Sequence, residues 1–123
     1  MTSTNHIRSI RPFIGSKNYQ QSIGFYQQLG FEVLNVGEKL SYVRMNEKIG
    51  FYLQDAYVKK WVHNTMLFFE VDDVGAWHQK VKELDLVNQY KVVRCSEIVY
   101  EDWGKEFFLH DPEGILLHIG NFK

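Results

Sequence analysis

The sequence contains the same order of secondary-structure signals twice, and this repeat restricts the available folds more than any other feature. Each half has a strand-like apolar segment, then an amphipathic helical pattern, then three more strand-like segments. The expected strands cover residues 7–14, 31–36, 40–46 and 49–54 in the first half, and 65–71, 90–99, 105–110 and 115–120 in the second. This order predicts two βαβββ modules and an α+β fold.

Each expected helix follows a residue that can cap its first turn. Ser16 or Asn18 precedes the first helix, and Asp72 or Asp73 precedes the second. Apolar residues then recur three or four positions apart: Tyr19, Ile23, Tyr26 and Leu29 in the first helix, and Val74, Trp77, Val81 and Leu84 in the second. We therefore expect each helix to pack one face against its sheet.

The bulk composition favours one compact domain without a membrane or nucleic-acid partner. The chain has 123 residues, is 45% hydrophobic and has a net charge of -1, with acidic and basic residues interleaved. It lacks both the basic patch of nucleic-acid-binding proteins and a run of about 18 apolar residues. The polar N-terminus differs from a signal peptide, and the single Cys95 excludes an intrachain disulfide. We expect a cytoplasmic protein in which Cys95 is structural.

The most specific motif extends from Trp103 to Ile119. Aromatic and aliphatic residues lie on both sides of the run from Asp111 to Gly114, where Pro112 presets a turn and Gly114 can adopt a positive φ. This motif resembles the C-terminal signature of the glyoxalase/bleomycin-resistance/dioxygenase superfamily, also called the vicinal oxygen chelate proteins. Residues 22–33 (SIGFYQQLGFEV) resemble the first helix and second strand of the same family.

The resemblance covers nearly the whole chain and implies a specific architecture. Residues 1–123 would form a single domain with module 1 at about 6–56, a linker at 57–64 and module 2 at about 65–123. The two modules would form a curved, mixed eight-stranded sheet with the helices on the convex side and a pocket on the concave side. Family members usually complete their sheets across a two-fold axis, so a homodimer is implied as well.

The positions that bind metal in catalytic family members do not have the required ligands here. By position they correspond to Arg11, Gln54, Met66 and His118. Arg11 repels a cation, and the thioether of Met66 is a poor ligand for a hard metal. Because a catalytic metal needs about three protein ligands, we expect no metal, no other cofactor and no catalytic residue.

Strand alternation then predicts which side chains face the concave pocket. Aromatic residues would form its walls and a few polar groups would orient a ligand. The candidate ligand-binding residues are Arg11, Phe13, Tyr52, Gln54, Phe68, Glu70, Trp103 and His118. Tyr42 and Arg44 share a strand face and could also reach the pocket, while Trp61 lies in the linker, where it could close the pocket or make a linker or dimer contact.

Structural explanations remain open for several of these residues. Phe13 and Phe68 could be ordinary core residues, and His118 could be a buried histidine with its hydrogen bonds satisfied. Arg11 and Glu70 could form an ion pair across the pocket, because an unpaired buried charge is costly.

Within the superfamily, the C-terminal motif is most similar to the bleomycin-resistance branch. That similarity implies a metal-independent protein that sequesters a cationic, aromatic-tailed antibiotic at a dimer interface. The chain departs from the branch in its near-neutral charge and in Arg11 and Arg44. We hypothesise a metal-independent small-molecule binding protein, with sequestration of an antibiotic or aromatic ligand as its specific form.

Two alternatives belong to other functional classes. One is a metal-dependent enzyme, either a glyoxalase-like lyase or isomerase or a dioxygenase, which would bind metal stoichiometrically. The other is a protein whose dimer surface is itself the function, which would have a filled cavity and no stabilisation by ligands.

Overall fold

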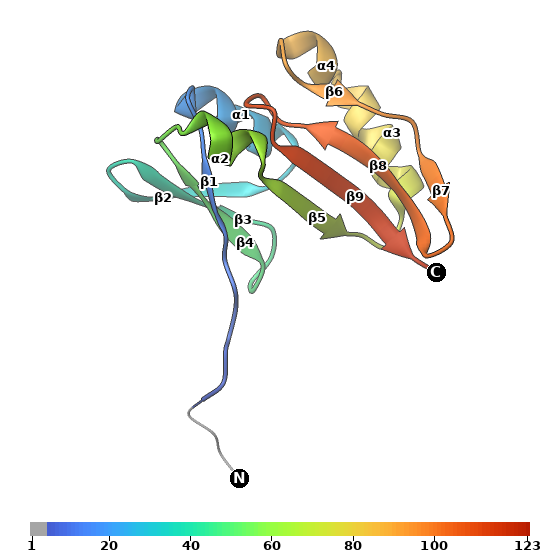
Figure 1. The fold of residues 1–123 in the computed structure, drawn as a ribbon, viewed down its shortest axis with the longest axis horizontal. Coiled ribbons are helices and arrows are strands. Elements are labelled where there is room, and N and C mark those ends of the chain that lie inside the picture. Colours follow the sequence, from blue (N-terminus) through green and yellow to red (C-terminus); the bar gives the residue numbers. More distant parts are fainter. Residues whose placement is uncertain (1–4) are drawn as a thin grey trace.

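Two β-sheets, one from each half of the chain, form the framework of the molecule (Figure 1). The computed structural model describes residues 5–123. The first sheet has the order β1 (Phe13–Gly15), β4 (Gly50–Gln54), β3 (Leu40–Arg44) and β2 (Glu32–Gly37). The second has the order β5 (Met66–Glu70), β9 (Leu116–Phe122), β8 (Gly104–His110) and β6 (Arg94–Cys95), and β7 (Val99–Glu101) also pairs with β8. In each sheet the first strand is parallel to its neighbour and the other pairs are antiparallel.

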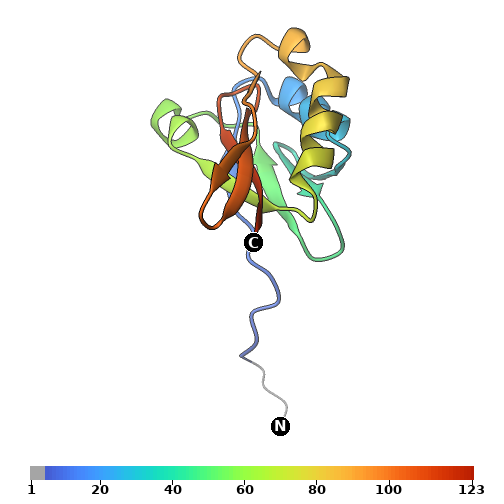
Figure 2. The same ribbon diagram turned by 90° about the vertical axis from the view of Figure 1, so that its right-hand side faces the viewer.

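Three helices lie together on one side of the sheets, and a short helix lies on the other side (Figure 2). The first group consists of α1 (Tyr19–Gln28), α3 (Val74–Leu84) and the one-turn α4 (Leu86–Gln89), and the separate helix is α2 (Lys59–His63). Asn18 caps α1 by accepting from the N–H of Gln21, and Asp73 caps α3 by accepting from the N–H of Ala76. None of the helices in residues 5–123 has the length and apolarity needed to cross a membrane.

The predicted α+β fold with two βαβββ modules is confirmed, but three details differ. The strands form two separate sheets instead of one eight-stranded sheet. The expected strand at 90–99 begins only at Arg94, after α4 has ended at Gln89, and it is interrupted at Ser96, whose hydroxyl accepts from the N–H of Phe108; pairing resumes at Val99 in β7. The expected strand at 7–14 is shorter and shifted: pairing begins at Phe13, after Pro12, which has no N–H to donate.

The hydrophobic core fills the space between the helices and the sheets. Alternate strand residues point into it, as the period of two requires. Fully buried side chains come from both modules: Ile14, Phe25, Tyr26, Leu29 and Leu53 from the first, and Phe107, Leu109, Leu117 and Ile119 from the second. The residues between these strand positions therefore face away from α1 and α3.

The turn between β8 and β9 docks against α1 and joins the two modules. The Tyr26 hydroxyl donates to Asp111 Oδ2 at 2.8 Å, and the N–H of Asn18 donates to Glu113 Oε2 at 2.7 Å. Asp111 Oδ1 also accepts from the N–H groups of Glu113 and Ile115. Asp111 is thus a turn residue, consistent with the turn expected in this motif.

Candidate ligand-binding site

The predicted site residues lie mainly in two aromatic clusters, one on each sheet. The Arg11 cluster consists of Arg11, Phe13, Tyr42 and Tyr52, and the Phe68 cluster consists of Phe68, Trp103, His118 and Phe122. Arg11 precedes β1 and Trp103 lies in the turn before β8, whereas the other members lie on strand positions that alternate with buried core residues. They therefore lie on the sheet faces directed away from the core.

Stacked rings and one cation build the Arg11 cluster. The rings of Phe13 and Tyr52 stack with centroids 4.7 Å apart, and the ring of Tyr42 lies 5.2 Å from that of Tyr52. Arg11 places Cζ 4.5 Å from the centroid of Tyr42 and donates from Nη1 to the Tyr52 hydroxyl at 3.1 Å. Phe13 remains 55% exposed, so this surface can contact another molecule.

Tyr42 is buried under the guanidinium, and Gly50 makes its position possible. A Cβ atom at Gly50 would lie 2.5 Å from both Cζ and the hydroxyl of Tyr42. The Tyr42 hydroxyl has no hydrogen-bond partner within the part of the chain that the structure describes. Because Gly50 has no side chain, the ring of Tyr42 can lie against this position, beneath the guanidinium of Arg11.

Phe68 is at the centre of the second cluster. Its ring stacks on Phe122 with centroids 5.5 Å apart and lies 5.9 Å from Trp103 and 6.1 Å from His118. His118 Nδ1 lies 2.9 Å from Glu106 Oε1, and both side chains are largely buried. Phe68 and Trp103 are 42% and 36% exposed, so the cluster presents an apolar surface next to a polar pair.

A cavity of about 440 Å³ adjoins the Phe68 cluster and includes Phe68 in its wall. It lies between β5, the β3–β4 turn and α3, and most of its wall is apolar. Its lining residues are Phe31, Met45, Asn46, Ile49, Phe68, Phe69, Glu70, Val71 and Trp77. Such a volume, mainly apolar with a few polar groups, is typical of small-molecule sites.

Seven of the eight candidate ligand-binding residues lie in these three places, and Gln54 lies outside them. Phe68 and Glu70 line the cavity, and Gln54 lies two residues beyond Tyr52 on β4, opposite Gly15. Between residues 5 and 123 the ion pairs are Arg44 with Glu32 and His118 with Glu106. The hypothesis of an ion pair between Arg11 and Glu70 is therefore wrong, because Arg11 contacts tyrosines instead.

Sequence reasoning missed Phe31, Met45 and Trp77 as candidate site residues. Phe31 and Trp77 lie 6.1 Å apart between their centroids, although one follows α1 and the other belongs to α3. Their apolar character is visible in the sequence, but it equally predicts core packing. Only the relative position of the two modules shows that they line a cavity.

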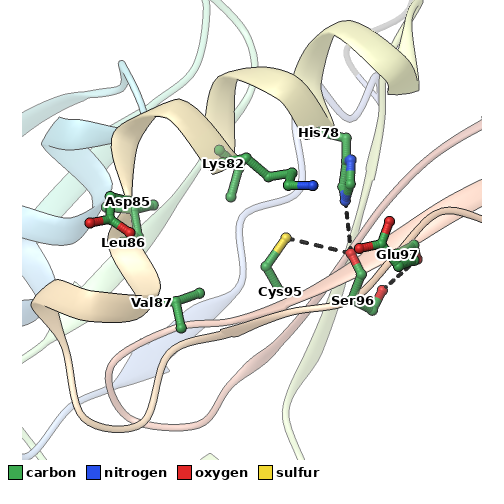
Figure 3. A pocket seen from close by; sticks show the side chains of 9 residues that line it. His78, Lys82, Asp85, Leu86, Val87, Cys95, Ser96 and Glu97 are labelled. Atoms are coloured by element: carbon green, nitrogen blue, oxygen red, sulfur yellow. Dashed lines mark hydrogen bonds between the residues drawn. The ribbon is translucent and has the colours of Figure 1, made fainter.

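A second cavity of about 200 Å³ lies between α3, α4 and β6 (Figure 3). The Cys95 thiol donates to the carbonyl of Ser96 at 3.6 Å, and His78 Nε2 lies 2.9 Å from the same oxygen. Burial raises the pKa of the Cys95 thiol, as does Glu97, while Lys82 lowers it. A protonated thiol is a weak nucleophile, which favours the structural interpretation of Cys95.

The residues at the family's metal positions do not fit a metal. Arg11 presents a guanidinium, Met66 lies on β5 opposite Leu116, and His118 is engaged by Glu106. No group of three or more His, Cys, Asp and Glu residues suited to hold a metal ion occurs in the described range 5–123.

We predict that the purified protein does not bind zinc, nickel or iron(II) tightly at one ion per chain. The reason is that Glu106 is the neighbouring acidic ligand of His118, but no group of three or more suitable ligands occurs among residues 5–123, and about three are needed. Isothermal titration calorimetry of protein first treated with a chelator measures this directly. One-to-one binding that is lost in His118→Ala would contradict the prediction.

Similarity to known proteins extends over nearly the whole chain. Residues 4–119 match a family model described as the Glyoxalase/Bleomycin resistance protein/Dioxygenase superfamily. A search of curated protein sequences finds no match.

Several solved structures have a similar fold at low sequence identity. The bleomycin-binding protein of Streptomyces verticillus, complexed with copper(II)-bleomycin, superposes with a TM-score of 0.79 at 20% identity over 96% of this chain and 98% of that chain. The antibiotic-binding protein TnmS3 from Streptomyces sp. CB03234 gives 0.71 at 16% identity, with both chains fully covered. A lactoylglutathione lyase from Agrobacterium tumefaciens gives 0.70 at 15% identity, with 92% of each chain covered. One fold thus carries both binding proteins and an enzyme, so function must be argued from the site.

Proposed function

This chain belongs to the glyoxalase/bleomycin resistance protein/dioxygenase superfamily, and we propose that it is a metal-independent binding protein that sequesters an aromatic or amphipathic small molecule such as an antibiotic. The observation that carries the proposal is the aromatic surface on the open sheet faces. Phe13, Phe68, Trp103 and Phe122 are each at least one-third exposed in this structure and lie beside a few polar groups. Grouped exposed aromatics usually mark a binding surface.

The cavity beside Phe68 supports the same proposal. Its volume of about 440 Å³ is within the range for drug-sized ligands, and Glu70 and Asn46 supply polar contacts. Two of the structurally similar proteins are described as binding bleomycin and an antibiotic. The residues at the metal positions lack a complete ligand set, which favours binding over metal-dependent lyase or dioxygenase chemistry.

A thermal-shift experiment with a panel of aromatic antibiotics, bleomycin among them, tests the proposal. A ligand at a hundred times its Kd stabilises the folded protein by about 2.7 kcal/mol. We expect at least one antibiotic to raise the Tm without added metal, and Phe68→Ala to reduce that shift strongly because the ring joins the cluster to the cavity.

Trp61→Ala is the matched control, because Trp61 is 73% exposed on α2 and is not part of either cluster. It should keep the full ligand-induced shift. Equal shifts in both variants would argue against the Phe68 cluster as the site, provided that Phe68→Ala alone melts cooperatively. A shift that requires a divalent metal and disappears with chelator would favour the enzyme.

We further propose that the protein is a cytoplasmic homodimer in which the N-terminal arm contributes to the interface. The arm, residues 5–10, extends away from the sheets (Figure 1), and it leaves Ile7 and Ile10 87% and 90% exposed. A second copy that covers these side chains would remove the cost of exposing them.

The double substitution of Ile7 and Ile10 by serine should weaken or abolish the dimer. Sedimentation velocity over a range of protein concentrations measures the change in the monomer–dimer equilibrium. Serine at Val87 and Val92, which are also exposed but distant from the arm in sequence, should leave the equilibrium unchanged. A dimer of undiminished stability in the Ile7/Ile10 variant would exclude the arm from the interface.

A further inference from the structure

We infer that the Arg11 cluster selects ligands in which an aromatic ring carries an anionic group, such as a carboxylate, sulfonate or phosphate. This inference rests on the proposed function, since it names the class of ligand that the site would take. The guanidinium of Arg11 lies 4.5 Å from the Tyr42 centroid and 5.9 Å from that of Tyr52.

Arg11 has donors to spare and forms no ion pair with any acidic residue between positions 5 and 123. A guanidinium has five N–H donors, and Arg11 uses one of them in a hydrogen bond from Nη1 to the Tyr52 hydroxyl. The two ion pairs found across residues 5–123 involve other charged groups. The tyrosines therefore hold the guanidinium of Arg11 in place, and because Arg11 is exposed its other N–H groups are open to a ligand.

The other charged residue on the same face does not compete for an anion. Arg44 shares the face of β3 with Tyr42, but its Nη2 lies 2.5 Å from Glu32 Oε1 on the neighbouring strand. That pair is neutral overall. Arg11, by contrast, has no ion-pair partner among residues 5–123.

The exposed rings beside Arg11 determine the rest of the ligand. Phe13 stacks on Tyr52 at 4.7 Å and is more than half exposed, so a flat aromatic group can extend the stack. An anion attached to that group would meet the guanidinium, which favours bidentate contacts with carboxylate-like oxygens.

The Phe68 cluster is unsuited to the same ligand class. Its cationic candidate, His118, is already engaged by Glu106, and the neighbouring cavity has the carboxylate of Glu70 in its wall. Electrostatics thus assigns the anionic group to the first sheet and leaves the Phe68 cluster to neutral or cationic parts of a ligand.

Two fluorescent probes of nearly the same shape test the inference. The first is 8-anilinonaphthalene-1-sulfonate, and the second is N-phenyl-1-naphthylamine, which has the same rings without the sulfonate. We expect the wild-type protein to bind the sulfonated probe at least about tenfold more tightly, because a charge-assisted contact is added. Raising the salt concentration should reduce this preference.

Arg11→Met should remove the preference and leave the affinity for the neutral probe within about twofold, since the apolar stem is preserved. Lys17→Met is the matched control, because Lys17 is also a cation beside an aromatic ring, 5.8 Å from Tyr57, but lies outside the cluster. It should keep the preference. The melting temperature of each variant is measured to show that both remain folded.

The outcomes separate the two proposals. Binding of the neutral probe without a preference for the sulfonate, or a preference that survives in Arg11→Met, overturns this inference but leaves the proposed function intact. Absence of binding by either probe to the folded wild-type protein counts against both.

Discussion

Replacing Gly104 by alanine should destabilise the protein by about 3 kcal/mol or more, because the new methyl group would collide with backbone atoms. A Cβ at this position would lie 2.1 Å from the carbonyl oxygen of Asn121 and 2.9 Å from Cα of Phe122. Gly104 also has a φ of +157°. Neither the clash nor this backbone conformation can be relieved by rotating a side chain, so β8 and β9 would have to separate at this end.

The consequence extends to the proposed site. Gly104 is paired with Phe122 and follows Trp103, and both aromatic residues belong to the Phe68 cluster. Gly104→Ala should therefore lower the free energy of unfolding in urea and weaken any ligand that contacts this cluster.

Gly24→Ala is the appropriate control for that experiment. Gly24 lies inside α1, and a Cβ there would meet the hydroxyl of Tyr90 at 3.7 Å, an ordinary contact. Because alanine favours a helix interior by about 1 kcal/mol over glycine, this variant should be as stable as the wild type or more stable. Equal stability of Gly104→Ala and the wild type would show that β8 and β9 can accommodate a Cβ atom at this position without loss of pairing.

The second large effect is on the pH dependence of stability, through Asp111. Burial raises the pKa of this carboxyl from its ordinary value near 3.8 to about 6, although hydrogen bonds from Tyr26, Ile115 and Glu113 lower it. The folded state therefore binds a proton more tightly than the unfolded state. Protonation of Asp111 thus stabilises the folded state. This stabilisation is fully present below the pKa that Asp111 has in the unfolded chain, and it is lost as the pH rises through about 6.

We expect the free energy of unfolding contributed by this group to increase by about 3 kcal/mol as pH falls, mostly between pH 6 and 4. Urea titrations of the wild type and Asp111→Asn across this range isolate the effect. The asparagine retains an acceptor for the turn and cannot titrate, so the difference between the two proteins should show the predicted slope.

Tyr26→Phe provides a second, independent readout. The pKa of the Tyr26 hydroxyl is itself raised by burial and by Asp111, so it remains a proton donor. Removing that donor should raise the pKa of Asp111 further and shift the transition to higher pH, with a cost near neutral pH of about 1–3 kcal/mol. Identical pH profiles for the wild type and Asp111→Asn would contradict the assignment of the effect to Asp111.

Local patterns predicted the elements because each depends on residues close in sequence. The turn at Asp111–Gly114 was visible in the sequence, and each helix cap was one of two candidates, of which the structure uses Asn18 and Asp73. Strand alternation also predicted that Phe13 and Tyr52 share one face, as their register shows. The role of these residues in ligand binding stays a prediction.

The strand prediction was wrong where a side-chain hydroxyl takes the place of a backbone carbonyl as hydrogen-bond acceptor. Ser96 accepts from the N–H of Phe108 and divides a strand that looked continuous in the sequence. The hypothesis of an ion pair with Glu70 was also wrong, since Arg11 contacts Tyr42 and Tyr52 instead. The orientation of an exposed, flexible side chain depends on its neighbours in space, which the sequence does not show.

By itself, then, the sequence determined the order of the strands and of the two longer helices, the residues that cap those helices, and the face that strand residues such as Phe13 and Tyr52 occupy. These properties follow from periods of two and 3.6 residues and from short-range capping. Only the tertiary structure decided that the strands form two sheets, that Tyr26 meets Asp111, and that Phe31 and Trp77 enclose a cavity. The physical reason is that these contacts join residues distant in sequence, and packing between modules, which no local pattern encodes, sets their distances.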